Sequence, residues 1–451
     1  MRDWSAEQVA ATAGARRVHR ALEREDPGRS QARGAAATPT DASGPLRAVV
    51  DTRILKPGDL FVGLPGAHVD GGRFAAGALR AGAWGVLVGP EHVEEARAVP
   101  GEGAVLAADD PLDALQRLAA AWRRALDARV IGITGSTGKT STKDVLAAML
   151  ASHRRTTATP ANLNTEIGLP LTVLEAPPAT EVLVLEMAMR GAGQIADLAT
   201  IAEPDVGVVV NVGPVHLEQM GSLEGVAAEK GALLAALRPG GTAVIPAGEA
   251  LLTGHTAEGV RTVTFGPGGD VDDLGALQLS VASAHMRLNA LAALAAARAV
   301  GVEPAGRIEV ALSALRGQRR ELAGGVLVID DCYNANPMSM RAALDDLHAT
   351  AAGRRLAVLG DMLELGRGEG AFHRQVGAHA RERGVDLLVT VGPRAACMGE
   401  GFGGSGNLHA VGSAAEAAEL LPQLVRPGDT VLVKGSRGVG LEVVAEALAS
   451  R

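Results

Sequence analysis

The sequence predicts an α/β protein of three domains, and two observations support that prediction. Short runs of Val, Leu and Ile alternate with helix-like segments from Val130 onward, and the same alternation restarts near residue 316. Strands that are apolar on both faces, with helices between them, indicate parallel sheets covered by helices on both sides. A chain of 451 residues is also too long for one hydrophobic core. We place the three domains at 1–125, 126–315 and 316–451.

The first domain combines short strands with few helices. Residues 20–46 are polar and rich in Ala, Gly and Pro, which predicts a loop. Beyond it, the strand-like segments "LRAVVDTR", "DLFVGL" and "GAWGVLVG" are separated by turns and by a helix at 73–82. An amphipathic helix at 112–127 leads into the second domain.

The second and third domains repeat a regular order of strand and helix. The second has the strands "RVIGIT", "EVLVLEM", "DVGVVVNVG" and "TAVIP", with helices at 139–153, 193–202, 223–237 and 285–300. The third has the strands "GVLVIDD", "RRLAVLGD", "DLLVTVG" and "DTVLVKG", with helices at 338–350, 369–384, 413–424 and 438–449. This repetition predicts a doubly wound, Rossmann-like third domain, and ligands gather at the carboxyl ends of such strands.

Composition excludes several classes of function. A net charge of −8 argues against a nucleic-acid-binding surface, which normally carries a basic excess. The two cysteines, Cys332 and Cys397, cannot form a disulfide framework and suit a reducing compartment. No apolar run reaches membrane-spanning length, and the segment "MRDWSAEQVAATAG" predicts a capped helix, not a signal peptide. We therefore expect a cytoplasmic protein without nucleic-acid partners or membrane insertion. A monomer is our expectation, and the sequence leaves the oligomeric state open.

A phosphate-binding loop follows the first strand of the second domain. It runs directly from strand to helix and consists of Gly135, Ser136, Thr137, Gly138, Lys139, Thr140 and Ser141. Its backbone N–H groups and the helix N-terminus suit phosphate oxygens, with Lys139 on the β- and γ-phosphates and Thr140 on Mg²⁺. Ile133 stands where the longer G-x-x-x-x-G-K-[ST] loop has glycine, which points away from GTPases and motor ATPases. The alternative is a Gly/Ser-rich turn that carries a surface lysine.

Polar side chains follow several of the predicted strands. Glu186 ends one strand of the second domain, and Asn211 and His216 lie just past another. Glu186 and His216 could hold a second Mg²⁺, although His is an unusual ligand for so hard a cation. By residue type alone, His216 is also consistent with an ordinary hydrogen-bonded histidine, and Lys230 with a solvated lysine. In the third domain "VIDDCYNANP", "AVLGDMLELG" and "LVKGSRGVG" place acids, amides and a lysine after three strands. Such groups suit a ribose hydroxyl, a base amide or a phosphate, or they cap helices.

The combination of motifs resembles the Mur ligase family. The segments that carry the resemblance are "GITGSTGKTSTKD", "NLNTEIGLPLTVL", "VLEMAMRGAGQI", "NVGPVHLE", "DDCYNANPMSMRAAL", "LGDMLELG" and "LVKGSR". They occur in the family's order and cover nearly the whole chain from about residue 47. "DDCYNANP" and "GDMLELG" are the most discriminating, and they resemble the branch of the family that adds a D-alanyl-D-alanine dipeptide. The segment "DTRILKPGDLFVGLPGAHVDGGRF" is similar to the family's uridine-nucleotide-binding domain.

The resemblance implies a reaction and its cofactors. ATP would phosphorylate the terminal carboxylate of UDP-N-acetylmuramoyl-tripeptide, and the amine of D-alanyl-D-alanine would attack the acyl phosphate to give the UDP-muramoyl-pentapeptide. The first domain would bind the uridine nucleotide, the central domain ATP with two Mg²⁺ ions, and the third would complete the ligase site. Two alternatives stay open: a sister ligase that adds D-glutamate or a diamino acid, and a phosphate-loop switch or regulatory ATPase without ligase activity. The third residue of the tripeptide also stays open.

The resemblance also assigns roles to residues. The catalytic set would be Lys139, Glu186, His216 and Lys230, with Thr140 and Glu186 on one Mg²⁺, His216 on the second, and Lys230 at the position that several members carbamoylate. ATP would further contact Asn289, Arg319, Asp331 and Asn334. The uridine diphosphate would meet Asp51, Thr52, Arg53, Gly66 and Asp70, and the muramoyl group would meet Asn162, Asn164 and Thr165.

Three positions depart from the family pattern. Met286 stands where the adenine motif usually has asparagine, and Gly72 stands where the uridine site usually has histidine. The segment "LRGQRRE" replaces a plainer Gly-Arg step. It leaves Arg316, Arg319 and Arg320 all as candidate nucleotide contacts.

Overall fold

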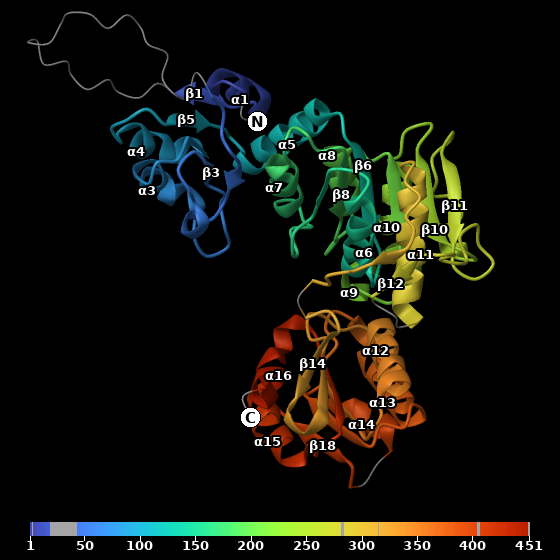
Figure 1. The fold of residues 1–451 in the computed structure, drawn as a ribbon. Helices are drawn as coiled ribbons and strands as arrows, with labels where there is room; N and C mark the ends of the chain where they lie inside the picture. The colour runs from blue at the N-terminus through green and yellow to red at the C-terminus, as the bar shows by residue number, and fades with distance from the viewer. Residues whose placement is uncertain (2, 19–42, 281–283, 314, 404–405, 450–451) are drawn as a thin grey trace, which may run out of the picture. The chain divides into compact units, whose positions relative to one another are not determined.

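The computed structural model describes residues 1, 3–18, 43–280, 284–313, 315–403 and 406–449 (Figure 1). Most of the loop predicted at 20–46 therefore lies outside the described residues. The chain divides into two compact units, one of Met1–Gly132, Arg154–Met187 and Asp197–Pro204, the other of Ile133–His153, Ala188–Ala196 and Asp205–Arg451. The predicted domain limits at residues 125 and 315 stay predictions.

The first unit contains a five-stranded sheet in the order β1-β5-β4-β3-β2. Its strands are β1 (Arg16–Val18), β2 (Ala48–Val49), β3 (Leu60–Val62), β4 (Gly85–Val88) and β5 (Ala104–Ala107), and β1 is the antiparallel member. The helices are α1 (Ala6–Ala13), α3 (Ala75–Arg80), α4 (Val93–Arg97) and α5 (Pro111–Leu126). Apolar side chains of β3, β4 and β5 pack against α3 and α4 to form the core.

Two of the predicted helices of this unit begin at clear caps. Ser5 and Gln8 form a capping box at α1, so the helix expected in "MRDWSAEQVAATAG" is confirmed. At α5, the Asp110 carboxylate accepts hydrogen bonds from Leu112 N and Asp113 N, and Pro111 occupies the first turn.

The central sheet has the order β11-β10-β9-β6-β8-β7. Its strands are β6 (Arg129–Thr134), β7 (Thr156–Ala158), β8 (Val182–Glu186), β9 (Val206–Val209), β10 (Thr242–Pro246) and β11 (Arg261–Phe265). The helices are α6 (Lys139–Ala151), α7 (Gly168–Glu175), α8 (Gln194–Ala202), α9 (Leu217–Met220), α10 (Leu223–Ala235) and α11 (Ala284–Ala299). A small parallel pair, β12 (Gln278–Leu279) and β13 (Arg307–Ile308), lies outside this sheet.

The C-terminal sheet has the order β14-β15-β19-β16-β17-β18. Its strands are β14 (Gln318–Leu322), β15 (Val326–Asp330), β16 (Arg355–Gly360), β17 (Leu387–Val391), β18 (Leu408–Val411) and β19 (Thr430–Lys434). One apolar cluster packs α12 (Pro337–Thr350), α13 (Glu369–Glu382) and α14 (Ala396–Phe402) against one face, and another packs α15 (Ala414–Leu424) and α16 (Glu442–Ala449) against the other (Figure 1). The predicted doubly wound α/β class is confirmed.

The sequence analysis missed the two edge strands of this sheet. β14 is antiparallel to β15 and lies in "LRGQRRE", where four consecutive polar residues hide the strand pattern. β18 pairs with β17 alone and has no fully buried residue. Edge strands need little apolar character, because water covers one of their sides.

Among the residues that the structure describes, no helix combines the length and apolar character that a membrane span requires.

Candidate active site

The phosphate-binding loop is held from behind by the segment that follows β9. Thr137 N donates to Asn211 Oδ1 at 2.9 Å, and Asn211 Nδ2 donates back to Thr137 O at 3.2 Å and Oγ1 at 3.0 Å. Ser136 Oγ likewise accepts from Gly213 N at 2.8 Å and donates to Gly213 O at 3.0 Å. These bonds fix the loop between β6 and α6 before any phosphate binds. The sequence analysis noticed Asn211 at a strand end but gave it no role.

Asn289 of α11 closes the other side of the loop. Gly138 has a φ of 76°, and a Cβ built on it would lie 2.4 Å from Asn289 Oδ1. Only glycine therefore fits beside the asparagine. Asn289 is buried and its Nδ2 lies 3.7 Å from Met286 Sδ, so the methionine of the unusual adenine motif contacts the motif's asparagine directly.

Lys139 and Thr140 begin α6 at the mouth of the loop. Lys139 Nζ donates to Gly135 O at 2.7 Å, which keeps the ammonium over the loop. The buried Thr140 hydroxyl accepts from Arg316 Nη2 at 3.2 Å, and the guanidinium of Arg316 stacks on the ring of Tyr333, 3.9 Å from its centroid. Ser141 lies one residue further along the same first turn.

The three candidate arginines have different surroundings. Arg316 reaches the phosphate loop, whereas Arg319 Nη2 pairs with Asp346 Oδ2 of α12 at 2.8 Å. Arg320 Nη2 lies 3.8 Å from Asp330 Oδ2. Arg319, the residue that the sequence analysis favoured as a nucleotide contact, therefore has an acidic partner on its own domain, and Arg316 is the arginine that contacts the loop.

Lys230 lies on α10 with its side chain enclosed. The residue is 2% exposed, and among the described residues its ammonium nitrogen has one side-chain contact, Met189 Sδ at 3.9 Å. The neighbouring carboxylate of Glu229 is occupied by Gly193 N at 2.7 Å and Ile195 N at 2.8 Å. Burial, reinforced by the charge of Lys139, holds the pKa of Lys230 well below its usual value. The charged form of this amine is therefore disfavoured.

His216 stands at the start of α9 with a φ of 51°. Its Nδ1 lies 2.5 Å from Glu364 Oε2, which belongs to the turn after β16. Burial lowers the pKa of His216, and the charge and hydrogen bond of Glu364 partly oppose that shift. A neutral imidazole with one nitrogen bonded to a carboxylate is a common arrangement of metal-binding histidines.

Glu186 ends β8 in the first unit and is 1% exposed. Its Oε1 accepts a hydrogen bond from Asn164 Nδ2 at 2.7 Å. Its Oε2 is buried and has no hydrogen-bond partner among the described residues. A buried carboxylate oxygen without a donor is costly unless a cation completes it. The loop that supplies Asn164 is held internally by Asn164 N to Asn162 O at 2.8 Å, and Thr165 O accepts from Leu169 N at 2.9 Å.

The N-terminal candidate residues form two local clusters. The Asp51 carboxylate accepts hydrogen bonds from the backbone N–H and the guanidinium of Arg53, at 2.6 to 3.0 Å, and Thr52 lies between the two residues in the chain. These hydrogen bonds lower the pKa of Asp51 to about 2. Gly66 N donates to Val69 O at 3.2 Å in the turn that precedes Asp70.

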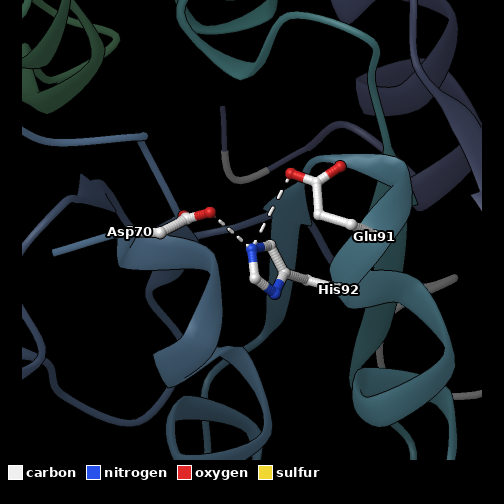
Figure 2. A group of neighbouring side chains, drawn as sticks. All are labelled: Asp70, Glu91 and His92. Atoms are coloured by element: carbon white, nitrogen blue, oxygen red, sulfur yellow. Dashed lines mark hydrogen bonds and ion pairs between the residues drawn. The ribbon is translucent and has the colours of Figure 1, made fainter.

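Figure 2 shows the second cluster, in which His92 Nε2 lies 2.8 Å from Asp70 Oδ2. A Cβ built on Gly72 would fall 2.0 Å from the ring of His92. The histidine expected at position 72 is thus absent, and an imidazole from residue 92 fills the space beside Asp70. Sequence reasoning missed His92, because it lies 22 residues from Asp70 in the chain.

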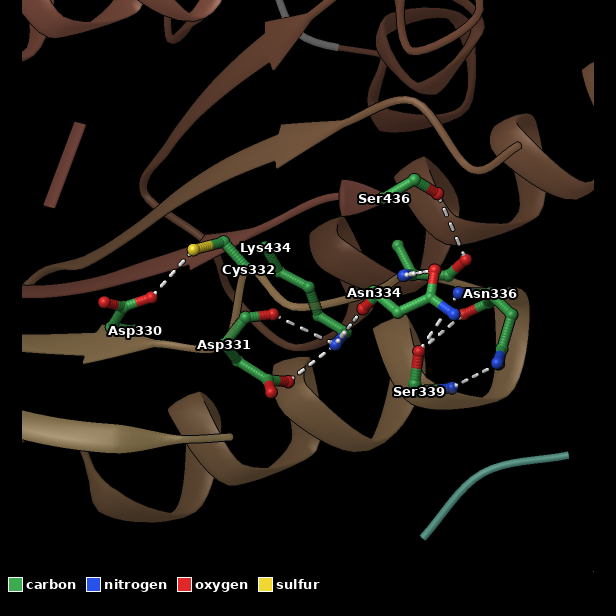
Figure 3. Close-up of polar contacts among 9 residues, drawn as sticks. Asp330, Asp331, Cys332, Asn334, Asn336, Ser339, Lys434 and Ser436 are labelled. Atoms are coloured by element: carbon green, nitrogen blue, oxygen red, sulfur yellow. Dashed lines mark hydrogen bonds and ion pairs between the residues drawn. The ribbon is translucent and has the colours of Figure 1, made fainter. Parts of the chain in front are cut away.

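The polar residues after β15 are tied to Lys434 at the end of β19 (Figure 3). Lys434 Nζ donates to Asp331 Oδ2 at 2.6 Å, to Asn334 O at 3.0 Å and to Asp331 O at 3.3 Å. Asn336 instead caps α12 through Ser339, which bears out the capping alternative for that residue.

Cys332 Sγ in the same segment lies 2.9 Å from Asp330 Oδ1, also drawn in Figure 3. Burial and the aspartate raise the pKa of this thiol. The cysteine is therefore an inert, hydrogen-bonded part of the strand end.

Comparison with known proteins shows to which family the chain belongs. Residues 133–293 match the family model described as the Mur ligase middle domain, and residues 315–437 match the model described as the Mur ligase glutamate ligase domain. The UDP-N-acetylmuramoyl-tripeptide–D-alanyl-D-alanine ligase of Synechocystis is 38% identical over 88% of this chain and 90% of its own length. The protein of the same name from Bacillus subtilis is 36% identical over 88% of this chain and 92% of its own length. The chain belongs to the Mur ligase family.

Solved structures agree with this assignment of a Mur ligase. The MurF of Acinetobacter baumannii matches with a TM-score of 0.82 at 28% identity over 99% of both chains. The MurF ligase of Thermotoga maritima, solved in complex with ADP, matches with a TM-score of 0.76 at 30% identity over 90% of this chain and 97% of its own. The family resemblance and the α/β fold predicted from the sequence are thereby confirmed for this Mur ligase.

Proposed function

We propose that this Mur ligase joins D-alanyl-D-alanine to UDP-N-acetylmuramoyl-tripeptide with ATP, through an acyl phosphate. One observation carries the proposal: relatives from three bacteria share the name UDP-N-acetylmuramoyl-tripeptide–D-alanyl-D-alanine ligase. They are 34 to 38% identical to this protein over 88% of its chain. The similarity thus extends over most of the chain and over 90 to 92% of each relative's own length. The phosphate-binding loop and the strand-end carboxylates supply the chemistry.

The phosphate loop would hold the triphosphate of ATP. Backbone N–H groups of Gly135 to Thr140 and the N-terminus of α6 favour phosphate oxygens, and the Lys139 ammonium would neutralise the β- and γ-phosphates. The substrate carboxylate and the γ-phosphate are both negative, so this neutralisation and accurate positioning dominate the catalysis. We propose that Asn289 contacts the adenine, that Asp331 and Asn334 reach the nucleotide, and that Arg316 takes the arginine role first assigned to Arg319.

The donor set suits magnesium. Mg²⁺ prefers oxygen ligands, and Glu186 offers a buried carboxylate oxygen without a donor while Thr140 offers a hydroxyl. We propose that these two hold one Mg²⁺ and that His216 serves the second. When bound, the ions would neutralise charge on the transferred phosphoryl group.

Lys230 is proposed to act as a carbamate. Its neutral amine would attack CO₂, forming one C–N bond and releasing one proton, and the product is an anionic oxygen ligand. A buried ammonium beside Lys139 would repel Mg²⁺, whereas a carbamate would bind it. The absence of a carboxylate partner for Lys230 among the described residues supports this role.

The remaining candidates are proposed for the muramoyl substrate. Asp51, Thr52, Arg53, Gly66 and Asp70 would meet the uridine diphosphate. The muramoyl group would meet Asn162, Asn164 and Thr165. Among these residues, Asn164 is also the hydrogen-bond partner of Glu186. We further propose that the protein works as a monomer in the cytoplasm.

The test is incorporation of separate amine substrates. Purified protein is incubated with ATP, Mg²⁺ and UDP-N-acetylmuramoyl-tripeptide, together with labelled D-alanyl-D-alanine, D-glutamate or a diamino acid. We expect product with D-alanyl-D-alanine alone, and incorporation of only one of the others would contradict the proposal. ATP hydrolysis that does not depend on the muramoyl substrate would favour a regulatory ATPase instead. Lys139→Ala should abolish acyl phosphate trapped by hydroxylamine, with the thermal unfolding midpoint as the control for folding.

A further inference from the structure

Two turns far apart in the sequence meet at His216 and Glu364. His216 follows β9 in the central part of the second unit, and Glu364 follows β16 in the C-terminal sheet. Their Nδ1 and Oε2 atoms lie 2.5 Å apart across 148 residues of sequence. The imidazole is 23% exposed and the carboxylate 50% exposed, so water covers only part of the pair.

The backbone at both residues is strained. His216 has a φ of 51° and Glu364 a φ of 62°, values that side chains other than glycine adopt rarely. Each such residue costs roughly 1 kcal/mol, and the cost is tolerated only where the surroundings require that conformation. Both residues thus adopt an uncommon backbone conformation at the place where a hydrogen bond joins their side chains.

Two glycines near this pair also approach neighbouring segments. A Cβ on Gly366 would lie 3.5 Å from Glu218 N, and a Cβ on Gly213 would lie 1.9 Å from Met338 Sδ of α12. The turn after β16 therefore contacts the start of α9 beside Glu364, and the segment that precedes His216 packs closely on α12.

We infer that Glu364 is a positioning residue for the metal ligand His216. A carboxylate accepts at Nδ1, so Nδ1 carries the hydrogen and Nε2 carries the lone pair that a cation needs. The inference rests on the proposed role of His216 and adds a residue outside the set assigned to the site. Because Glu364 lies in the turn after β16 and His216 at the start of α9, cation affinity and the contact between the two turns are coupled, and each strengthens the other.

The test measures cation affinity without ligase turnover. Binding of Mn²⁺ is followed by electron paramagnetic resonance of the free ion, with a non-hydrolysable ATP analogue present. Glu364→Ala and Glu364→Gly should weaken binding of one ion about 10- to 100-fold. The glycine variant suits the positive φ, so it separates loss of the carboxylate from misfolding. The affinity of Glu364→Gln should lie between those of the wild type and the alanine variant, because its amide oxygen still accepts a hydrogen bond from His216 Nδ1. Glu400→Gln, at an exposed pair with Arg374, is the matched control and should bind as wild type does.

A double-mutant cycle distinguishes the possible failures. His216→Ala should lose the same ion, and adding Glu364→Ala should cause little further loss, since both act through one ligand. Additive losses, or wild-type affinity in both the alanine and the glycine variants at 364, would overturn the positioning role. If His216→Ala itself leaves Mn²⁺ binding unchanged, the proposed metal role of His216 is wrong, and the inference falls with it. The ligase assay with separate amines is unaffected by either outcome.

Discussion

Lys230 and Lys434 are both 2% exposed, both belong to the second unit, and they have opposite surroundings. Lys434 donates to the Asp331 carboxylate and to two backbone carbonyls. Lys230 Nζ lies 3.9 Å from the thioether sulfur of Met189. The carboxylate of Glu229, next to it in sequence, instead accepts hydrogen bonds from two backbone N–H groups. Burial alone therefore does not determine the role of a lysine, because the acceptors around its ammonium group also matter.

The difference follows from the cost of burying an ammonium. Removing that charge from water costs several kcal/mol, which an aligned carboxylate and further acceptors can offset. Lys434 has those acceptors and forms a structural link between two strand ends. Lys230 lacks them, and burial holds its pKa well below the usual value, which favours the nucleophilic, neutral amine.

The largest expected effect is on turnover. Lys230→Met should reduce kcat about 10³-fold, because it would remove the proposed carbamate ligand of the Mg²⁺ that neutralises charge on the transferred phosphoryl group. Lys230→Ala should regain part of the rate in the presence of short carboxylic acids, which can replace the carbamate. Steady-state phosphate release measures both, and Lys434→Ala assayed with the same acids is the control. Absence of any rescue would leave an unmodified lysine equally credible.

The second effect is on stability. Lys434→Met should lower the free energy of unfolding by about 3 kcal/mol, because it leaves Asp331 without its counter-charge. Urea unfolding at neutral pH measures this loss. Lys434→Met combined with Asp331→Asn should recover part of it, and an unchanged midpoint in the single variant would show that the pair contributes no stability.

The third effect has the opposite sign. In CO₂-free buffer Lys230→Met should raise the free energy of unfolding by about 1 kcal/mol or more, because methionine needs no hydration. Between the lowered pKa of folded Lys230 and the usual value near 10.5, the unfolded chain binds the proton that the folded chain lacks. Wild-type stability should therefore rise with pH across this window, by at most about 1.4 kcal/mol per pH unit, and the advantage of the variant should shrink. Urea unfolding at several alkaline pH values tests this, and parallel curves for the two proteins would contradict it.

The smallest effect concerns CO₂ itself. Removing CO₂ should reduce wild-type turnover several-fold, and bicarbonate should restore it, since carbamate formation is reversible. Residual activity of Lys434→Met should respond to CO₂ in the same proportion, because Lys434 takes no part in the modification. A wild-type rate that is indifferent to CO₂ would speak against the carbamate.

The sequence predicted what depends on local pattern. Alternating apolar strands and helices gave the α/β class, and the loop before Lys139 was recognisable because its glycines and lysine are contiguous. A signal for the burial of Lys230 was also present: α10 is rich in apolar and small residues with little separation into two faces, which is typical of a largely covered helix. The solvated-lysine interpretation overlooked that pattern.

What the sequence did not predict depends on distant partners. Asn211 behind the phosphate loop, His92 beside Asp70 and Glu364 on His216 are separated from those partners by 74, 22 and 148 residues. No periodicity connects such pairs, because the fold alone brings them together. The polar edge strand β14 was missed for a related reason: pairing with β15, not apolar character, holds it in place.

The enclosed thiol of Cys332 makes the protein simple to label. Its raised pKa and burial protect it from alkylation, whereas Cys397 of α14 is partly exposed, and the chain has no other cysteine. A maleimide dye should therefore attach at one defined place in the C-terminal sheet domain without any engineered substitution. That natural attachment point allows fluorescence to follow how this domain responds to nucleotide in the unmodified enzyme.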